Sequence, residues 1–111
     1  MKNETIFRQR VDEFLSQLDN CVDFSIQQVA IRGDFDKILC IHGKFVGAEI
    51  KDDETRLEPL QAYKAKLVEA AGGIAILIRP RNFSLVKDLL TKMSHGFYDR
   101  NLMHEVNKQG A

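Results

Sequence analysis

Apolar residues recur at three- and four-residue steps between Ile6 and Leu18, and this period predicts an amphipathic helix over residues 6–18. Asn3 or Thr5 is suited to cap this helix, because a short polar side chain accepts a hydrogen bond from the unpaired N–H groups of a first turn. The expected inner face consists of Ile6, Phe7, Val11, Phe14, Leu15 and Leu18.

A change of period after this helix predicts strands. Apolar and polar residues alternate over residues 21–31, with a slip near Gln27-Gln28, and two further strands are expected over residues 37–42 and 45–51. The pair Gly43-Lys44 suits a two-residue hairpin loop of type II′, which takes glycine at its first position.

The second half of the chain predicts three more elements. A polar loop leads to a helix over residues 59–71, and an uninterrupted apolar run at residues 74–78 predicts a buried strand. A last helix is expected over residues 84–93. The inner face of the helix over 59–71 is expected to carry Leu60, Tyr63 and Leu67, with Ala70 or Ala71.

The tail from His95 onward is weakly patterned and is expected to be either helical or frayed. The order of elements is thus αβββαβα, within one domain that spans residues 1–111. A helix between the third and fourth strands is typical of a parallel crossover, whereas a hairpin is antiparallel. The expected fold is therefore an α/β sandwich, with a mixed sheet flanked by helices.

The expected hairpin brings charged side chains to one end of the sheet. It places Asp36 opposite Lys51 and Ile38 opposite Glu49, and directly opposed residues share a face. The other face is an aliphatic core surface that consists of Leu39, Ile41, Val46, Ala48 and Ile50.

Asp36, Glu49 and Lys51 form the first candidate site. Two carboxylates so close together repel each other unless a cation lies between them, and Mg²⁺ is held in proteins by one or two carboxylates with waters. Charged residues at strand ends are also commonly solvated or paired with one another, and this alternative stays open. The position of Glu49 and Lys51 in an otherwise apolar strand, followed by a helix that carries Gln61, favours a site.

Composition narrows the class of protein. The chain of 111 residues is 44% hydrophobic and 29% charged, as expected of one small globular domain with a modest core. Its sixteen basic and sixteen acidic residues cancel, which argues against bulk attraction to nucleic acid. Residues 1–36 are acidic on balance and residues 79–111 are basic, so any polyanion contact is expected in the C-terminal third.

Cys21 and Cys40 belong to no Cys/His cluster and are interpreted as structural thiols. The longest run without a charge, Ala70 to Ile78, is far shorter than the ~20 residues that cross a bilayer. Residues 1–5 lack the apolar core of a signal peptide. The sequence therefore predicts a cytoplasmic protein with no membrane partner.

Four short motifs occur in a definite order along the chain. They are Arg32-Gly33-Asp34-Phe35-Asp36, Gly43-Lys44-Phe45-Val46-Gly47-Ala48-Glu49-Ile50-Lys51, Arg56-Leu57-x-Pro59-Leu60-Gln61 and Ala71-Gly72-Gly73. Together they resemble the VRR-NUC nucleases, a branch of the restriction-endonuclease-like PD-(D/E)XK superfamily. The resemblance covers nearly the whole chain and implies a restriction-endonuclease-like αβββαβ core. Phe35 departs from the family, which usually has proline there.

The resemblance implies a metal-dependent hydrolysis of phosphodiester bonds in DNA, supported by Mg²⁺ and also by Mn²⁺. It assigns catalysis to Asp36, Glu49, Lys51 and Gln61, and metal binding to Asp36, Glu49 and the carbonyl oxygen of Ile50. Lys51 is expected to orient the attacking water or to stabilise the developing charge. Gln61 is expected to position Lys51 or a phosphate.

Other residues are weaker candidates. Glu4 is the best match to an additional acid on the first helix of the family, and Glu13 is a poorer one. Contacts to DNA are expected from Gln27, Gln28, Arg32, Arg79, Arg81 and Lys87.

The implied function is that of a structure-specific DNA endonuclease, most closely a homodimeric Holliday-junction resolvase, because two sites related by a two-fold axis suit symmetric cuts in branched DNA. Cleavage of flaps or nicks is the nearest alternative. A catalytically silent DNA-binding module with the same fold is another, favoured by Phe35 and the zero net charge. The joint presence of the four catalytic candidates opposes it.

Overall fold

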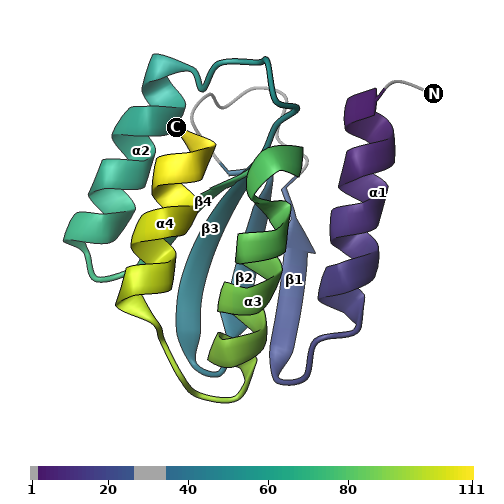
Figure 1. Ribbon diagram of the computed structural model, residues 1–111. Helices are drawn as coiled ribbons and strands as arrows, with labels where there is room; N and C mark the ends of the chain where they lie inside the picture. The colour runs from purple at the N-terminus through teal and green to yellow at the C-terminus, as the bar shows by residue number, and fades with distance from the viewer. Residues whose placement is uncertain (1–2, 27–34) are drawn as a thin grey trace.

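The computed structural model describes residues 3–26 and 35–111. Its strands form one four-stranded sheet, and Figure 1 shows helices on both faces of the sheet. The elements are α1 (Asn3–Ser16), β1 (Cys21–Ser25), β2 (Lys37–Ile41), β3 (Lys44–Ile50), α2 (Pro59–Ala70), β4 (Ile74–Ile78), the 3₁₀ helix η1 (Pro80–Asn82), α3 (Phe83–Ser94) and α4 (Arg100–Gly110). The predicted order αβββαβα is confirmed, and α4 is an additional helix in the weakly patterned tail.

The sheet has the strand order β1-β2-β3-β4. β1 pairs with β2 and β2 pairs with β3 in antiparallel fashion, whereas β3 and β4 are parallel and are connected through α2. The predicted mixed sheet is therefore confirmed. β1 ends at Ser25, and the slip predicted near Gln27-Gln28 lies outside the described residues.

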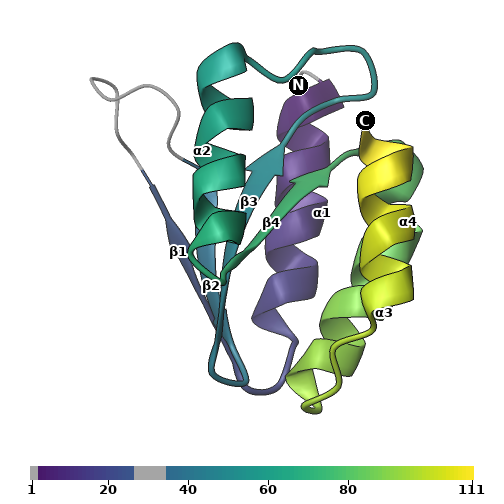
Figure 2. The ribbon, with the colours of Figure 1, turned by 90° about the vertical axis from the view of Figure 1, so that its left-hand side faces the viewer.

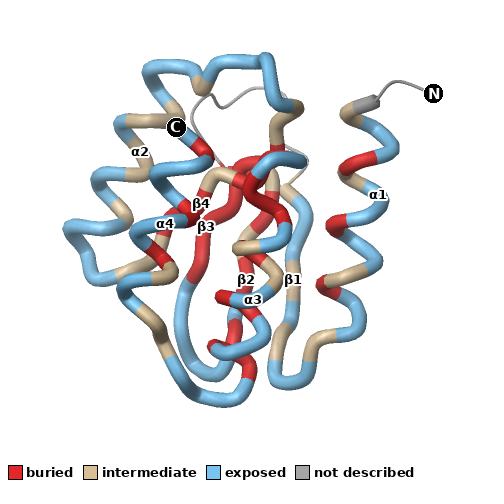
Figure 3. Tube along the Cα trace, viewed as in Figure 1, coloured by how far each residue is buried: buried red, intermediate tan, exposed pale blue. Residues whose placement is uncertain are grey.

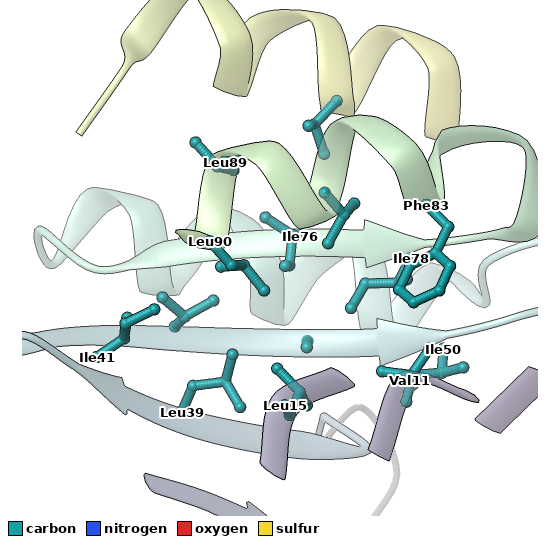
Figure 4. Packing of buried hydrophobic residues seen from close by; sticks show 14 of the residues in the cluster. Val11, Leu15, Leu39, Ile41, Ile50, Ile76, Ile78, Phe83, Leu89 and Leu90 are labelled. Carbon is teal, nitrogen blue, oxygen red and sulfur yellow. The ribbon is translucent and has the colours of Figure 1, made fainter. Parts of the chain in front are cut away.

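One face of the sheet carries the hydrophobic core. Figure 2 separates α2, on one side of the sheet, from α3 and α4 on the other. Buried residues line β2, β3 and the inner sides of α1 and α3 in Figure 3, and Figure 4 shows their side chains packed together. The predicted core surface of the hairpin is confirmed, since each of its members is at most 1% exposed: Leu39, Ile41, Val46, Ala48 and Ile50.

α1 packs on this core through Phe7, Val11 and Leu15, which are all buried. The ring of Phe7 meets that of Phe83 edge-on, with 5.3 Å between centroids, and this contact fixes the helix against α3. The helix begins at Asn3, earlier than the periodicity suggests, so Thr5 lies inside the first turn. Ile6, expected on the inner face, is 44% exposed.

The hairpin loop differs from the prediction. Ile41 pairs with Lys44, so the loop is His42-Gly43 and not Gly43-Lys44. Both loop residues have positive φ, 46° and 79°, which is the type I′ conformation and not type II′. The register moves by two residues, and because side chains alternate with a period of two, no residue changes face.

The inner face predicted for α2 is wrong. Leu60, Tyr63 and Leu67 are 48%, 61% and 45% exposed. The side that is less exposed carries Gln61 and Val68 in their place. The helix contacts β4 and reaches Glu49 of β3 through Gln61, so it presents a mixed polar and apolar face to the sheet.

α4 begins after Asp99, whose carboxylate accepts a hydrogen bond from the N–H of Leu102 at 3.0 Å and so caps the helix. Met103 and Val106 are its buried residues that join the core. Two apolar anchors one turn apart are a weak periodic signal, which is why the sequence left this tail undecided. Within the described residues, none of the helices has the length and apolar character needed to cross a membrane.

Candidate active site

Asp36 and Glu49 meet where β2 begins and β3 ends. The backbone N–H of Asp36 donates to Oε1 of Glu49 at 3.1 Å. The backbone N–H of Ile50 donates to Oδ2 of Asp36 at 2.8 Å. Each carboxylate therefore accepts a hydrogen bond from the neighbouring strand, so the two strand segments hold the pair together. The observed register brings these two acids closer than the predicted one, which placed Asp36 opposite Lys51.

Gln61 is the third member of the site, and α2 supplies it. Its Nε2 donates to Oε2 of Glu49 at 2.5 Å, while its Oε1 accepts from the backbone N–H of Glu58 at 3.0 Å. The amide thus joins the first turn of α2, which starts at Pro59, to the carboxylate. In this geometry Gln61 positions Glu49, whereas the sequence suggested that it positions Lys51 or a phosphate.

Glu49 has an unusual electrostatic environment. Glu49 is only 3% exposed and lies in the otherwise apolar second half of β3. Burial, and then the charge of Asp36, raise the pKa of Glu49 from 4.5 to about 7, while Lys51 and Arg8 oppose the rise. A buried acid beside a second acid is an arrangement that favours an added cation or proton.

Arg8 enters this site from α1, and sequence reasoning missed it. Its Nη2 donates to the carbonyl oxygen of Ile50 at 2.9 Å and lies 3.4 Å from Oδ2 of Asp36. Its Nε is 3.8 Å from Oε2 of Glu4, one helical turn earlier. The available signal is the spacing of four between Glu4 and Arg8, which predicts that the two side chains share a helix face.

Lys51 and Glu4 flank the acid pair. The backbone N–H of Lys51 donates to the carbonyl oxygen of Ile78 at 3.0 Å, which extends the parallel pairing of β3 and β4 by one residue. The ammonium of Lys51 makes no ion pair with the part of the chain that the structure describes, but its charge lowers the pKa of Glu49. Glu4 touches the site through Arg8.

The oxygen atoms at this position suit a hard cation. Asp36, Glu49 and the carbonyl oxygen of Ile50 are the donor types that Mg²⁺ takes together with waters. Across residues 3–26 and 35–111, no group of three or more His, Cys, Asp or Glu side chains is arranged to hold a metal ion. The protein ligands would therefore be two carboxylates and one carbonyl, which fits an ion that keeps several of its waters.

Phe35 has a packing role. It is 6% exposed, and its ring covers Gly47 so closely that a Cβ on that glycine would lie 2.6 Å from the ring. The residue that replaces the usual proline of the resembled family thus anchors the segment before Asp36 by contact with β3.

Three of the six residues expected to contact DNA lie outside the described residues, namely Gln27, Gln28 and Arg32. Arg79 is within them but is only 5% exposed. Its guanidinium donates to the carbonyl oxygens of Asp52 at 2.6 Å, Thr55 at 2.7 Å and Gly110 at 2.8 Å. This burial corrects the expectation for Arg79, which joins a loop to the end of α4 and is not presented to a ligand.

Arg81 and Lys87 are more accessible. The Arg81 guanidinium donates to the carbonyl oxygens of Asp53, Gln109 and Ala111, at 2.9, 2.6 and 2.6 Å. Nζ of Lys87 lies 4.8 Å from the ring centroid of Phe83. Contact with DNA stays a prediction for both.

A depression of about 1040 Å³ lies at the other end of β3. Lys44, Gly73, Tyr98 and His104 are among its lining residues, and none of the predicted catalytic residues takes part. The acid pair therefore lies outside this depression.

Comparisons of the chain with protein-family models, with curated proteins and with solved structures find no match.

Proposed function

We propose that this protein is a metal-dependent DNA endonuclease of the VRR-NUC type, with a restriction-endonuclease-like core. The observation that carries the proposal is the pairing of Asp36 and Glu49 at adjacent strand ends. Each carboxylate accepts a hydrogen bond from a backbone N–H of the other strand segment, and Glu49 is buried and has a raised pKa. The order of the sequence motifs supports it independently. The nucleic-acid substrate rests on the motifs alone.

In the proposed reaction, Asp36, Glu49 and the Ile50 carbonyl would hold Mg²⁺, with Mn²⁺ as a substitute. When bound, the ion would supply charge neutralisation at the phosphate and activation of the attacking water. Gln61 keeps the Glu49 carboxylate in a fixed orientation by its 2.5 Å hydrogen bond. Lys51, next to Glu49 along the chain, would orient the attacking water or stabilise the developing negative charge.

The proposal includes branched DNA as the substrate and a homodimer as the active form, and exposed apolar side chains support the homodimer. Exposed apolar side chains lie on β1 and β3 (Val22, Phe24 and Phe45) and on α2 (Leu60, Tyr63 and Leu67), and together we call them the apolar surface. Val22 and Phe45 both pair with Cys40, so these three side chains lie side by side on one face of the sheet. Apolar patches of this kind mark interaction sites, and a second copy would bury the same patch twice.

The deciding experiment incubates the protein with labelled four-way junction, flap and linear duplex, each with Mg²⁺, Mn²⁺ or EDTA. We expect metal-dependent cleavage, greatest on the junction. Glu49→Gln and Lys51→Ala should each lower the rate by about 10³-fold or more, since each change removes a charge from the transition state. Binding without cleavage in any metal would favour the silent DNA-binding module, and preference for a flap or nick would select the alternative nuclease.

Self-association is tested by sedimentation at micromolar protein. Leu67→Glu should shift a dimer towards monomer, because it places a charge in the apolar surface. Phe97→Glu is the matched control, since Phe97 is equally apolar and 57% exposed but belongs to the loop before α4. A wild-type protein that sediments as a monomer and still cuts both strands of a junction in one encounter would refute the dimer.

A further inference from the structure

One basic side chain lies among the oxygen atoms that would hold the metal ion. Nη2 of Arg8 contacts the carbonyl oxygen of Ile50 at 2.9 Å and Oδ2 of Asp36 at 3.4 Å. Nε of the same guanidinium faces Oε2 of Glu4 at 3.8 Å. Two of the three groups nominated for the ion, the Asp36 carboxylate and the Ile50 carbonyl, thus already face a positive charge.

The core fixes the backbone position of Arg8 on α1, whereas the aliphatic part of its side chain is free to rotate and can move the guanidinium. The neighbours Phe7 and Val11 are 4% and 1% exposed, and the Phe7 ring packs on Phe83. The Arg8 side chain itself is 35% exposed. Its guanidinium can therefore leave the acids by rotations of its stem while α1 stays in place.

A guanidinium and a divalent cation would compete for this position. Both need the carboxylate of Asp36 and the carbonyl of Ile50, and two positive charges at contact distance repel strongly in a partly buried site. The guanidinium of Arg8, 3.4 Å from Oδ2 of Asp36, already lessens the repulsion between the two acids. Arg8 thus supplies part of what the metal ion would supply.

We propose that Arg8 is a built-in counter-ion of the Asp36–Glu49 pair and that a divalent cation must displace it in order to bind. This inference rests on the proposed function, because it takes the same residues to be the metal ligands. Metal binding is then an exchange of cations. The apparent affinity for the metal equals the intrinsic affinity multiplied by the fraction of molecules in which Arg8 has left the position. The displaced guanidinium remains next to Glu4 on the same helix.

The test measures Mn²⁺ binding to the full chain without DNA, by the electron paramagnetic resonance signal of the unbound ion. Arg8→Gln should bind Mn²⁺ roughly tenfold more tightly than the wild type, because the ion no longer competes with charge-assisted hydrogen bonds. The control is Arg10→Gln. Arg10 carries the same charge on the same helix, but its guanidinium lies 5.8 Å from the Phe83 ring centroid, so its loss should change the affinity less than about twofold.

The outcomes separate the two proposals. Equal Mn²⁺ affinity in the wild type and Arg8→Gln, or an equal gain in Arg10→Gln, overturns the role of Arg8 and leaves the nuclease proposal standing. Absence of Mn²⁺ binding in all three proteins overturns both.

A second measurement needs no variant. In the wild type, Mg²⁺ should move the NMR signal of the Arg8 Nε–H together with the backbone amide signal of Ile50. A stationary Arg8 signal, with the Ile50 amide signal shifting, would overturn the displacement.

Discussion

Asp36 and Lys37 are neighbours at the start of β2, yet they belong to two different charged clusters on opposite sides of the strand. Nζ of Lys37 lies 2.8 Å from Oδ1 of Asp12 and 2.7 Å from Oδ2 of Asp23, and it donates to Oγ of Ser25 at 2.9 Å. An ammonium has three N–H groups, and each has a partner here. This cluster is complete.

The cluster of Asp36 and Glu49 is incomplete, because the repulsion between its two carboxylates is not fully compensated. Burial alone would lower the pKa of Lys37, but its hydrogen bonds to Asp12 and Asp23 raise it overall, so the folded protein favours the charged form. For Glu49, burial and the charge of Asp36 both raise the pKa, so the folded protein disfavours the charged form. A complete cluster stabilises the fold, whereas an incomplete one keeps an unfavourable interaction that a ligand can relieve.

The largest expected effect separates the two clusters by activity. Asp36→Asn should lower the rate of the proposed Mg²⁺-dependent DNA cleavage by about 10³-fold or more, because it would remove the charge of a proposed metal ligand. Asp23→Asn should leave the rate within about threefold, since Asp23 serves the fold. Single-turnover cleavage rates, with circular dichroism to verify folding, measure both. Equal losses in the two variants would contradict the distinction between the clusters.

The next effect concerns stability. Lys37→Met should lower the free energy of unfolding by about 2 kcal/mol, less than for a fully buried pair because Asp12 and Asp23 are 54% and 31% exposed and can be rehydrated. Lys51→Ala should cost less than about 0.5 kcal/mol, because Lys51 is only partly buried. Urea unfolding of the metal-free proteins measures both. The prediction fails if the two lysine variants lose the same stability.

A smaller effect depends on pH. Because the pKa of Glu49 is about 7 in the folded protein and 4.5 in the unfolded chain, the folded state binds the extra proton between these values. The contribution of Glu49 to stability therefore falls as pH rises from about 4.5 to about 7 and stays low above that.

Asp36→Asn removes the repulsion while its side-chain oxygen can still accept from the N–H of Ile50. It should therefore raise the stability of the metal-free protein by about 1 kcal/mol at pH 8, with no gain near pH 5, where Glu49 is protonated. Excess Mg²⁺ should abolish this gain in stability at pH 8, because the ion would bind, and so stabilise, the wild type much more than the variant that lacks the Asp36 carboxylate. Urea unfolding in EDTA and in Mg²⁺ at both pH values measures this, and a gain that persists at pH 5 would exclude repulsion as its cause.

The smallest effect tests how far the complete cluster tolerates a loss. Asp12→Asn should cost about 0.5 kcal/mol, because its carboxylate is 54% exposed and Asp23 still neutralises Lys37. The same urea experiment measures it, with Lys37→Met as the reference. A cost as large as that of Lys37→Met would mean that the ammonium cannot be held by Asp23 alone.

Local patterns of the sequence sufficed for most of the fold. The apolar run at 74–78 gives β4 with its observed bounds, and the alternation in β2 and β3 gives the correct core face even though the hairpin loop is shifted. That error is harmless for the faces because a shift of two residues preserves alternation. For α2 the pattern failed, since the stripe of Leu60, Tyr63 and Leu67 does not face the sheet.

By itself the sequence determined the order of the elements and the inward face of the hairpin, because alternation and helical period act between near neighbours. It nominated Asp36, Glu49 and Lys51 from the pairing of the hairpin, and Gln61 from its place on the next helix and from the motif resemblance. Only the tertiary structure decided that Arg8 reaches Asp36 and Ile50, which are 28 and 42 residues away, and that Gln61 holds Glu49. It also decided that burial raises the pKa of Glu49. These features depend on how α1 and α2 pack against the ends of the strands, and such long-range distances are set by the assembled core and not by local periodicity.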